Sequence, residues 1–328
     1  MADNQGYYGI PMLKRPLWRW EIAWYFFLEG ISSGAFILSA MARLFGRNRN
    51  RGLQRSVRYL SLATLLPCPP LLIADLGRPA RFHHMLRVWK RSSPMNTGAW
   101  ALMGYSVPVA LLAFDQLLYG RRDSSRALQR WSAVEMLGLP FAFTMVSYPG
   151  VLLSATSTPV WSQSPYLGGL LACSSLSTAA SAIALVIGLQ TDAGDHAPLQ
   201  SFEIIAKICE GALTGAYLAS SGRAAEPLTR GRYAKHIWIG AMGLGIVLPL
   251  AIHMASRRLP KRQRSLSLLS SVCSLAGGFC LKWAIVHSGP VSADDPEAAR
   301  YASRASTSKQ WCKEQLCACL GMSCLANL

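Results

Sequence analysis

Residues 57–79 read VRYLSLATLLPCPPLLIADLGRP, an apolar run that ends abruptly in Asp75 and Arg78. The apolar part is about as long as the roughly 20 residues with which a helix crosses the hydrocarbon of a membrane. The Gly77-Arg78-Pro79 turn ends the helix, because proline cannot continue it and also restricts the residue before it. A carboxylate and a guanidinium therefore meet at a lipid–water boundary, where charge is costly unless it serves a partner or a reaction.

The rest of the chain has the same apolar character. Hydrophobic residues make up 51% of the 328 residues and charged residues only 15%, which excludes a soluble domain. Eight segments are long enough to cross a membrane: Ile22–Phe45, Val57–Leu76, Gly98–Leu118, Val134–Leu153, Leu167–Leu189, Phe202–Ala219, Ile237–Ala255 and Leu266–Val286. None alternates with period two, so a β-barrel is not expected. The sequence predicts an all-α integral membrane protein with about eight transmembrane helices in two four-helix bundles, the second helix being kinked by Pro67, Pro69 and Pro70.

Basic residues predict the orientation of these helices. The connections after the first, third, fifth and seventh segments carry 15 Lys and Arg residues in total, whereas the N-terminal arm and the other connections carry 12. The positive-inside rule therefore places the first set in the cytoplasm and both termini outside.

Four polar residues gather at the predicted outer surface. Glu21 and Tyr25 are four residues apart at the start of the first segment, so they share a helix face. Asp75 ends the second segment, and Tyr148 precedes a Pro-Gly pair near the end of the fourth. Phenols and carboxylates beside apolar walls suit a quinone headgroup, whose carbonyls need donors and whose redox reaction moves protons.

The connection after the second segment is strongly basic on the side predicted to be outside. Its five positive residues are Arg78, Arg81, Arg87, Lys90 and Arg91. Such density on a translocated connection is explained if an acidic protein docks there.

Several ionisable residues fall inside apolar segments: Glu29, Glu135, Glu203, Lys207 and Glu210. The last three form one stripe at i, i+4 and i+7 on the sixth helix. Each costs at least about 2.5 kcal/mol at the bilayer centre. Two interpretations stay open, a neutralised Glu–Lys pair that fixes helix packing and a proton path from the outer pocket to the cytoplasm. Asp115 and Lys282 are expected near helix ends, where they snorkel to the surface.

No metal or haem site is predicted. His236 and His287 are both expected near the outer surface, and the cysteines within the segments are interpreted as small core residues. Cys312, Cys317, Cys319 and Cys324 near the C-terminus match neither zinc-ribbon nor ferredoxin spacing. The sequence is therefore divided into a membrane domain, 1–290, and a polar, cysteine-containing tail of unknown role, 291–328.

Three motifs in order resemble the NrfD/PsrC family of polysulfide-reductase-type membrane subunits. They are the opening LWRWEIAWYFFLEG of residues 17–30, the Asp75-Leu76-Gly77-Arg78-Pro79 turn, and YPGVLLSAT of residues 148–156. The resemblance covers residues 17–161 well, and the helix count extends it to about residue 288.

The resemblance implies a quinone-reactive anchor of a multi-subunit respiratory oxidoreductase. It implies that the positions of Tyr25 and Tyr148 bind a menaquinone or ubiquinone ring, although relatives can carry histidine at the position of Tyr25 and asparagine near that of Glu21. It further implies that the basic turn faces a ferredoxin-like iron–sulfur subunit, which connects to a catalytic partner that is often molybdopterin-dependent, in a bacterial or archaeal cytoplasmic membrane. Two other classes remain open: a secondary transporter, whose inverted repeats are not seen in the sequence, and a passive anchor without a quinone site.

Overall fold

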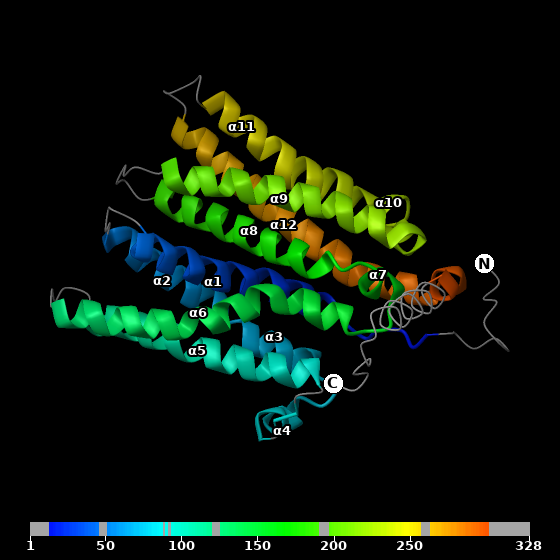
Figure 1. Cartoon of the computed structure of the whole chain (residues 1–328), viewed down its shortest axis with the longest axis horizontal. Coiled ribbons are helices and arrows are strands. Elements are labelled where there is room, and N and C mark those ends of the chain that lie inside the picture. Colours follow the sequence, from blue (N-terminus) through cyan, green and yellow to red (C-terminus); the bar gives the residue numbers. More distant parts are fainter. Residues whose placement is uncertain are drawn as a thin grey trace, which may run out of the picture.

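The computed structural model describes residues 13–45, 51–87, 89–90, 93–119, 125–189, 197–256 and 263–301, and every regular element in these ranges is a helix (Figure 1). The longer helices are α1 (Trp20–Phe45), α2 (Arg51–Leu65), α3 (Cys68–Asp75), α5 (Pro94–Tyr119), α6 (Ser125–Ser154), α8 (Leu167–Leu189), α9 (Ala197–Ser221), α11 (Leu248–Ser256) and α12 (Gln263–Asp294). The shorter ones are η1 (Pro79–Arg81), α4 (His83–Arg87), α7 (Pro159–Ser162), η2 (Gly222–Ala225) and α10 (Glu226–Thr229). A π-helical segment, η3 (His236–Val247), leads directly into α11.

Seven helical stretches of the described residues are long and apolar enough to cross a membrane. They comprise α1, α2 with α3, α5, α6, α8, η3 with α11, and α12. The remaining long helix, α9, has 25 residues, but Glu203, Lys207 and Glu210 reduce its apolar character. The chain is thus an all-α integral membrane protein, as predicted, while the count of eight crossings and the two four-helix bundles stay predictions.

The second predicted helix is broken where its prolines fall. α2 ends at Leu65 and α3 begins at Cys68, with Pro67 at the N-cap of α3 and Pro69 in its first turn. Proline has no N–H to donate and its ring clashes with the preceding turn, so one continuous α-helix cannot form there. α3 then ends at Asp75, before the Gly77-Arg78-Pro79 turn, as expected.

α1 and α8 lie against each other in the middle of the molecule (Figure 1). Small residues allow this approach, since a Cβ added at Gly34 would come 2.6 Å from the Ala179 Cβ. α2 and α6 pack on α1 and α5 packs on α2 and α6, whereas α9 and α12 pack on α8, and η3 and α11 pack on α12. We refer to these two sets of helices as the α1 group and the α8 group.

Successive long helices run in opposite directions, so the connections gather at two ends (Figure 1). The Asp75 end holds the start of α1, the end of α3 and the short helices α7 and α10. The Phe45 end, on the left of Figure 1, holds the end of α1 and the starts of α9 and α12. The arrangement brings the N-terminal side of α1 to the end that carries the basic turn.

Candidate functional site

Tyr25 of α1 and Tyr148 of α6, both predicted to bind a headgroup, lie together near the Asp75 end. Tyr25 is fully buried, and its hydroxyl oxygen has no hydrogen-bond partner among the described residues. The Tyr148 hydroxyl donates a 3.3 Å hydrogen bond to the Pro94 carbonyl at the start of α5. The Tyr148 ring covers Gly98, where any Cβ would overlap it. Both tyrosines belong to the same cluster of buried side chains.

Glu29 belongs to the same site, although the sequence placed it with the proton path. It follows Tyr25 by one helical turn, is fully buried, and lies within electrostatic range of both tyrosines. The Ser33 hydroxyl approaches one carboxylate oxygen at 3.4 Å, while the other oxygen has no hydrogen-bond partner among the described residues. A carboxylate therefore lies one helical turn further into the bundle than the Tyr25 phenol.

Glu21 and Asp75 lie nearer the Asp75 end than the two tyrosines do. Glu21 is one turn before Tyr25 on α1, and one of its carboxylate oxygens is buried without a hydrogen-bond partner in the described part of the chain. Asp75 is half-buried and lies within electrostatic range of the like-charged Glu21. It accepts a hydrogen bond from the Arg19 backbone N–H. The four predicted headgroup residues thus share the Asp75 end of the α1 group.

The site contains buried polar atoms that lack hydrogen-bond partners among the described residues and could bind a ligand. Most buried polar groups in proteins have hydrogen-bond partners, so the Tyr25 hydroxyl and the Glu29 and Glu21 oxygens need an explanation. A ligand at the end of an apolar body could accept a bond from the Tyr25 hydroxyl through a carbonyl oxygen, and in its reduced form could donate to the Glu29 or Glu21 oxygen through a hydroxyl. A quinone headgroup fits this donor and acceptor set.

The basic connection folds as a short surface arm made of η1 and α4. Arg78, Arg87 and Lys90 are exposed there, together with two aromatic side chains, Phe82 and Trp89, which are 41% and 53% exposed. The backbone of Arg81 lies in η1, and Arg91 lies outside the described residues. Exposed aromatic and basic side chains on one arm form a surface suited to binding a protein.

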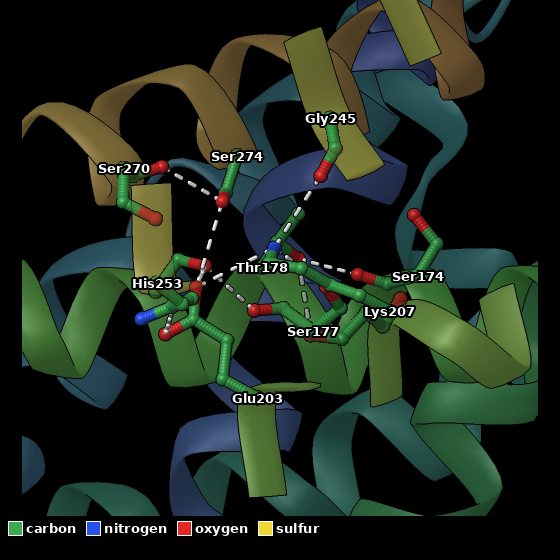
Figure 2. A network of polar contacts seen from close by, with 11 residues as sticks. Ser174, Ser177, Thr178, Glu203, Lys207, Gly245, His253, Ser270 and Ser274 are labelled. Carbon is green, nitrogen blue, oxygen red and sulfur yellow. Dashed lines mark hydrogen bonds and ion pairs between the residues drawn. The ribbon is translucent and has the colours of Figure 1, made fainter. Parts of the chain in front are cut away.

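The ionisable stripe of α9 continues into a network that the sequence did not reveal (Figure 2). The Lys207 ammonium lies 3.4 Å from the Glu203 carboxylate, and both side chains are closed off from solvent. His253 of α11 approaches the other oxygen of Glu203 at 3.5 Å. Sequence reasoning did not single out His253, because its partner is fifty residues away on another helix.

Lys282 corrects an expectation: it does not snorkel to the surface. Its side chain is fully buried, and its ammonium donates a 3.2 Å hydrogen bond to the Ser174 hydroxyl. It lies within electrostatic range of both Glu29 and Glu210. The predicted segment ended at Val286, but α12 continues to Asp294, so Lys282 is deep within the helix instead of near its end.

A row of hydroxyls on α8 faces these charged groups. Ser174, Ser177 and Ser181 follow one another at i, i+3 and i+7 on one helix face. Ser174 accepts from Lys282, Ser177 accepts from Lys207 at 3.3 Å, and Ser181 donates to Glu203 at 2.7 Å. The Lys207 ammonium also lies 3.4 Å from the Gly245 carbonyl (Figure 2). This carbonyl has no α-helical backbone donor, because the residue four positions later is Pro249, which has no N–H.

Glu135 has different partners from the α9 stripe. Glu135 lies on α6 near the Phe45 end. Its carboxylate is 2.7 Å from the Arg43 guanidinium and 3.1 Å from the Arg58 guanidinium. A small cavity, large enough for about one water molecule, adjoins Glu135, Arg58 and Ser61. These contacts join α6 to α1 and α2 inside the α1 group.

The described residues hold no group of three or more His, Cys, Asp or Glu side chains that could bind a metal ion. His236 and His287 both lie beside the Tyr233 ring, and His287 stacks on Trp283 with ring centroids 4.0 Å apart. The four cysteines of the tail lie outside the described residues, so the division at residue 290 stays a prediction.

The fold and these sites define a multi-pass membrane protein with buried polar networks. A family model described as polysulphide reductase, NrfD, matches residues 10–292, and the chain therefore belongs to the NrfD family. It is similar to one of the chains of the polysulfide reductase of Wolinella succinogenes, at 27% identity over 313 residues that cover 87% of this chain and 98% of that protein. It is also similar to an NrfD homolog of Haemophilus influenzae, at 25% identity over 319 residues that cover 87% and 98%. A shorter match, 24% identical over 112 residues, links 34% of this chain to 26% of a selenate reductase subunit of Mesobacillus selenatarsenatis.

Proposed function

We propose that this chain is the quinone-reactive membrane subunit of a multi-subunit reductase complex. The observation that carries the proposal is the burial of Tyr25, Glu29 and Tyr148 together, with unsatisfied oxygen atoms, at the end that carries the basic arm. Two of the relatives, one a chain of a polysulfide reductase and the other a subunit of a selenate reductase, support a role as one subunit of a reductase.

Each residue of the site has a definite task in this proposal. A bound menaquinone or ubiquinone supplies a two-electron, two-proton redox couple. The Tyr25 hydroxyl donates a hydrogen bond to one ring oxygen, and the Tyr148 hydroxyl donates to another in place of the Pro94 carbonyl, so the two fix the position of the headgroup. Glu29 accepts or returns a proton beneath the ring, and Glu21 and Asp75 exchange protons with the medium at the Asp75 end.

The electrons have to leave the site through another protein. A ferredoxin-like iron–sulfur subunit that docks on the basic arm would accept or deliver them, and it would connect to a catalytic subunit, often molybdopterin-dependent in this family. The positive charges of Arg78, Arg87 and Lys90 favour an acidic partner surface. The complex would lie in the cytoplasmic membrane, with the Asp75 end outside.

Binding and turnover of a quinol analogue test this proposal in the purified complex. The expected result is saturable binding that weakens in a Tyr25→Phe variant, which keeps the ring and deletes only the donor. Retained binding to the isolated protein, with no electron transfer to the complex, would indicate a non-reacting site. Absence of binding to both would show that the protein is a passive anchor.

A further inference from the structure

The small cavity beside Glu135 lies where α1, α2, α5 and α6 meet. It has room for about one water molecule, so it is far too small for a quinone or another organic ligand. Side chains of all four helices line it, among them the polar residues Ser39, Arg58, Ser61 and Glu135 and the apolar residues Val109 and Leu112. We call this space the four-helix cavity. A body bound in it would contact all four helices at once.

The charged groups beside the cavity do not balance one another. Arg43 and Arg58 both contact Glu135, at 2.7 Å and 3.1 Å. Arginine stays protonated in proteins, so the cluster has one excess positive charge. Asp115 of α5 also lies within electrostatic range of Arg58, but it is partly exposed, and its charge is therefore screened. An excess charge buried among helices is costly unless a counter-ion accompanies it.

Two serine hydroxyls on the cavity wall do not form the bond that serine commonly makes inside a helix. A helical Ser or Thr side chain can donate to the carbonyl four residues earlier, and Thr64 and Ser106 of the same group do so at 2.8 Å and 2.7 Å. Ser39 and Ser61 are only 8% and 2% exposed, yet their hydroxyls have no hydrogen-bond partner among the described residues. Both serines therefore have a donor available for a body in the cavity.

Arg58 supplies a third donor. Its two terminal nitrogens donate to Gln116 and Glu135, each at 3.1 Å. Its Nε can only donate, and it is buried without a partner in the part of the chain that the structure describes. Three unsatisfied donors thus belong to side chains that line one cavity, next to an excess positive charge. What this set lacks is a small acceptor that carries a negative charge.

We infer that the four-helix cavity binds one monatomic anion, a halide such as chloride. The ion would accept hydrogen bonds from the Ser39 and Ser61 hydroxyls and from the Arg58 Nε–H, and it would neutralise the excess positive charge. Phosphate, sulfate and carboxylate groups are too large for the space, whereas chloride is only slightly larger than water. By contacting α1, α2, α5 and α6, the ion would stabilise the α1 group. None of these residues belongs to the proposed headgroup site, so the inference does not depend on the proposed function.

Thermal unfolding of the purified full-length chain tests the inference, with sodium chloride, bromide and gluconate compared at equal ionic strength. Chloride and bromide should raise the Tm, whereas gluconate should not, because it cannot enter the cavity. Each ten-fold rise in halide concentration above the dissociation constant should favour the folded state by about ten-fold. The same Tm in all three salts, or an equal rise in all three, would overturn the inference.

Serine variants show where the halide acts. Ser39→Ala and Ser61→Ala each delete one donor to a charged group, and each should weaken halide binding at least about ten-fold. Ser106→Ala is the matched control, since that hydroxyl already donates to the Leu102 carbonyl, and it should keep the full halide effect. An equal halide effect in Ser61→Ala and Ser106→Ala would mean that the ion binds elsewhere, and the inference would fail.

Crystals grown in bromide locate the ion without any variant. They should show an anomalous peak in the four-helix cavity, bounded by Ser39, Ser61 and Arg58. A cavity that holds only a water molecule would refute the inference, even if halides raise the Tm. Glu135→Gln gives a result of the opposite sign to the serine variants. It removes a negative charge beside the ion, so halide binding should become tighter, and weaker binding would contradict the proposed anion site.

Discussion

The Lys207 ammonium lies 3.4 Å from the Glu203 carboxylate, one turn away on α9, and neither side chain reaches solvent. The same carboxylate accepts a hydrogen bond from Ser181 and faces His253, so three helices hold it in place. The arrangement is compatible with both interpretations of the α9 stripe, a packing pair and a proton path, because a neutralised pair can fix helix packing and also relay a proton.

Removing one member of the buried Glu203–Lys207 pair should impair assembly, whereas removing both members should not. Glu203→Gln or Lys207→Met leaves one buried charge without its main partner, which typically costs about 3–5 kcal/mol. Both single variants should therefore give low yields of folded complex and a lower Tm. The double variant removes both charges and should recover most of the yield.

An exposed ion pair provides the control for that experiment. Arg223 and Glu297 lie 3.0 Å apart with both side chains more than half exposed, where such pairs contribute about 0–1 kcal/mol. Glu297→Gln should leave the Tm nearly unchanged. A double variant of the buried pair that assembles no better than the singles would contradict the pairing argument.

Tyr148→Phe should lower quinol-linked turnover about ten- to a hundred-fold. The change keeps the ring over Gly98 but deletes a hydroxyl that, in the proposed function, exchanges its bond to the Pro94 carbonyl for one to a ring oxygen, a loss of roughly 1.5–3 kcal/mol when the acceptor changes charge. Steady-state rates with a soluble quinol analogue, at equal amounts of complex, measure the effect.

Tyr217→Phe is the matched control for Tyr148→Phe. Tyr217 is equally buried and donates a 2.8 Å hydrogen bond to the Val160 carbonyl, but it lies in the α8 group. Its loss should alter stability and not turnover. Equal effects of the two variants on turnover would mean that Tyr148 only contributes to packing.

Charge reversal on the basic arm should release the peripheral subunits. Arg78→Glu with Arg87→Glu changes two exposed residues of the arm by four charge units, so binding of an acidic partner should weaken sharply while the protein still inserts. Co-purification from membranes, at low and raised salt, measures the effect, and the wild-type complex should also loosen as salt rises.

Arg230→Glu with Lys235→Glu makes the same charge change on exposed residues at the Asp75 end, outside the arm. It should leave co-purification unaltered. If both double variants release the partner, general electrostatic attraction explains docking and the arm has no special role.

Gly277→Val should prevent η3 from packing on α12. The Gly245 and Gly277 backbones approach so closely that a Cβ at Gly277 would overlap the Gly245 backbone, which cannot move aside. Gly215→Val, where a Cβ would meet nothing within 4 Å, is the control. Thermal unfolding of the two variants should show a large loss of stability only for Gly277→Val.

Hydropathy predicted most of the fold because the bilayer imposes it. Segments of membrane length must be helical to satisfy their backbone groups, and the cluster of Pro67, Pro69 and Pro70 interrupts the second one, whereas α5, α6 and α12 continue through prolines. Glu21, Tyr25, Asp75 and Tyr148 could be predicted to lie at the same end of the molecule, because successive segments cross the membrane in opposite directions. The π-helical η3 could not be predicted, since its sequence has the same apolar character as the α-helices.

The polar network around the α9 stripe was only half visible in the sequence for a different reason. Glu203, Lys207 and Glu210 share one helix, and helical spacing reveals such a stripe. Lys282 and His253 join it through contacts between helices. The apolar run that defined the eighth segment also stopped before α12 did, which placed Lys282 too close to a helix end.

The length of the α9 stripe has an electrical consequence. Glu203 and Glu210 are seven residues apart, which separates them by about 10 Å along α9, a helix that runs from the Phe45 end to the Asp75 end. A charge carried along this line moves with or against the membrane potential, which is worth about 2.3 kcal/mol per elementary charge for a full crossing at 100 mV. A proton exchanged at the Asp75 end does not travel along this line, whereas a proton that passed along the stripe would cross part of that voltage. The end at which protons enter or leave thus decides whether electron transfer is electrically silent or charges the membrane like a capacitor.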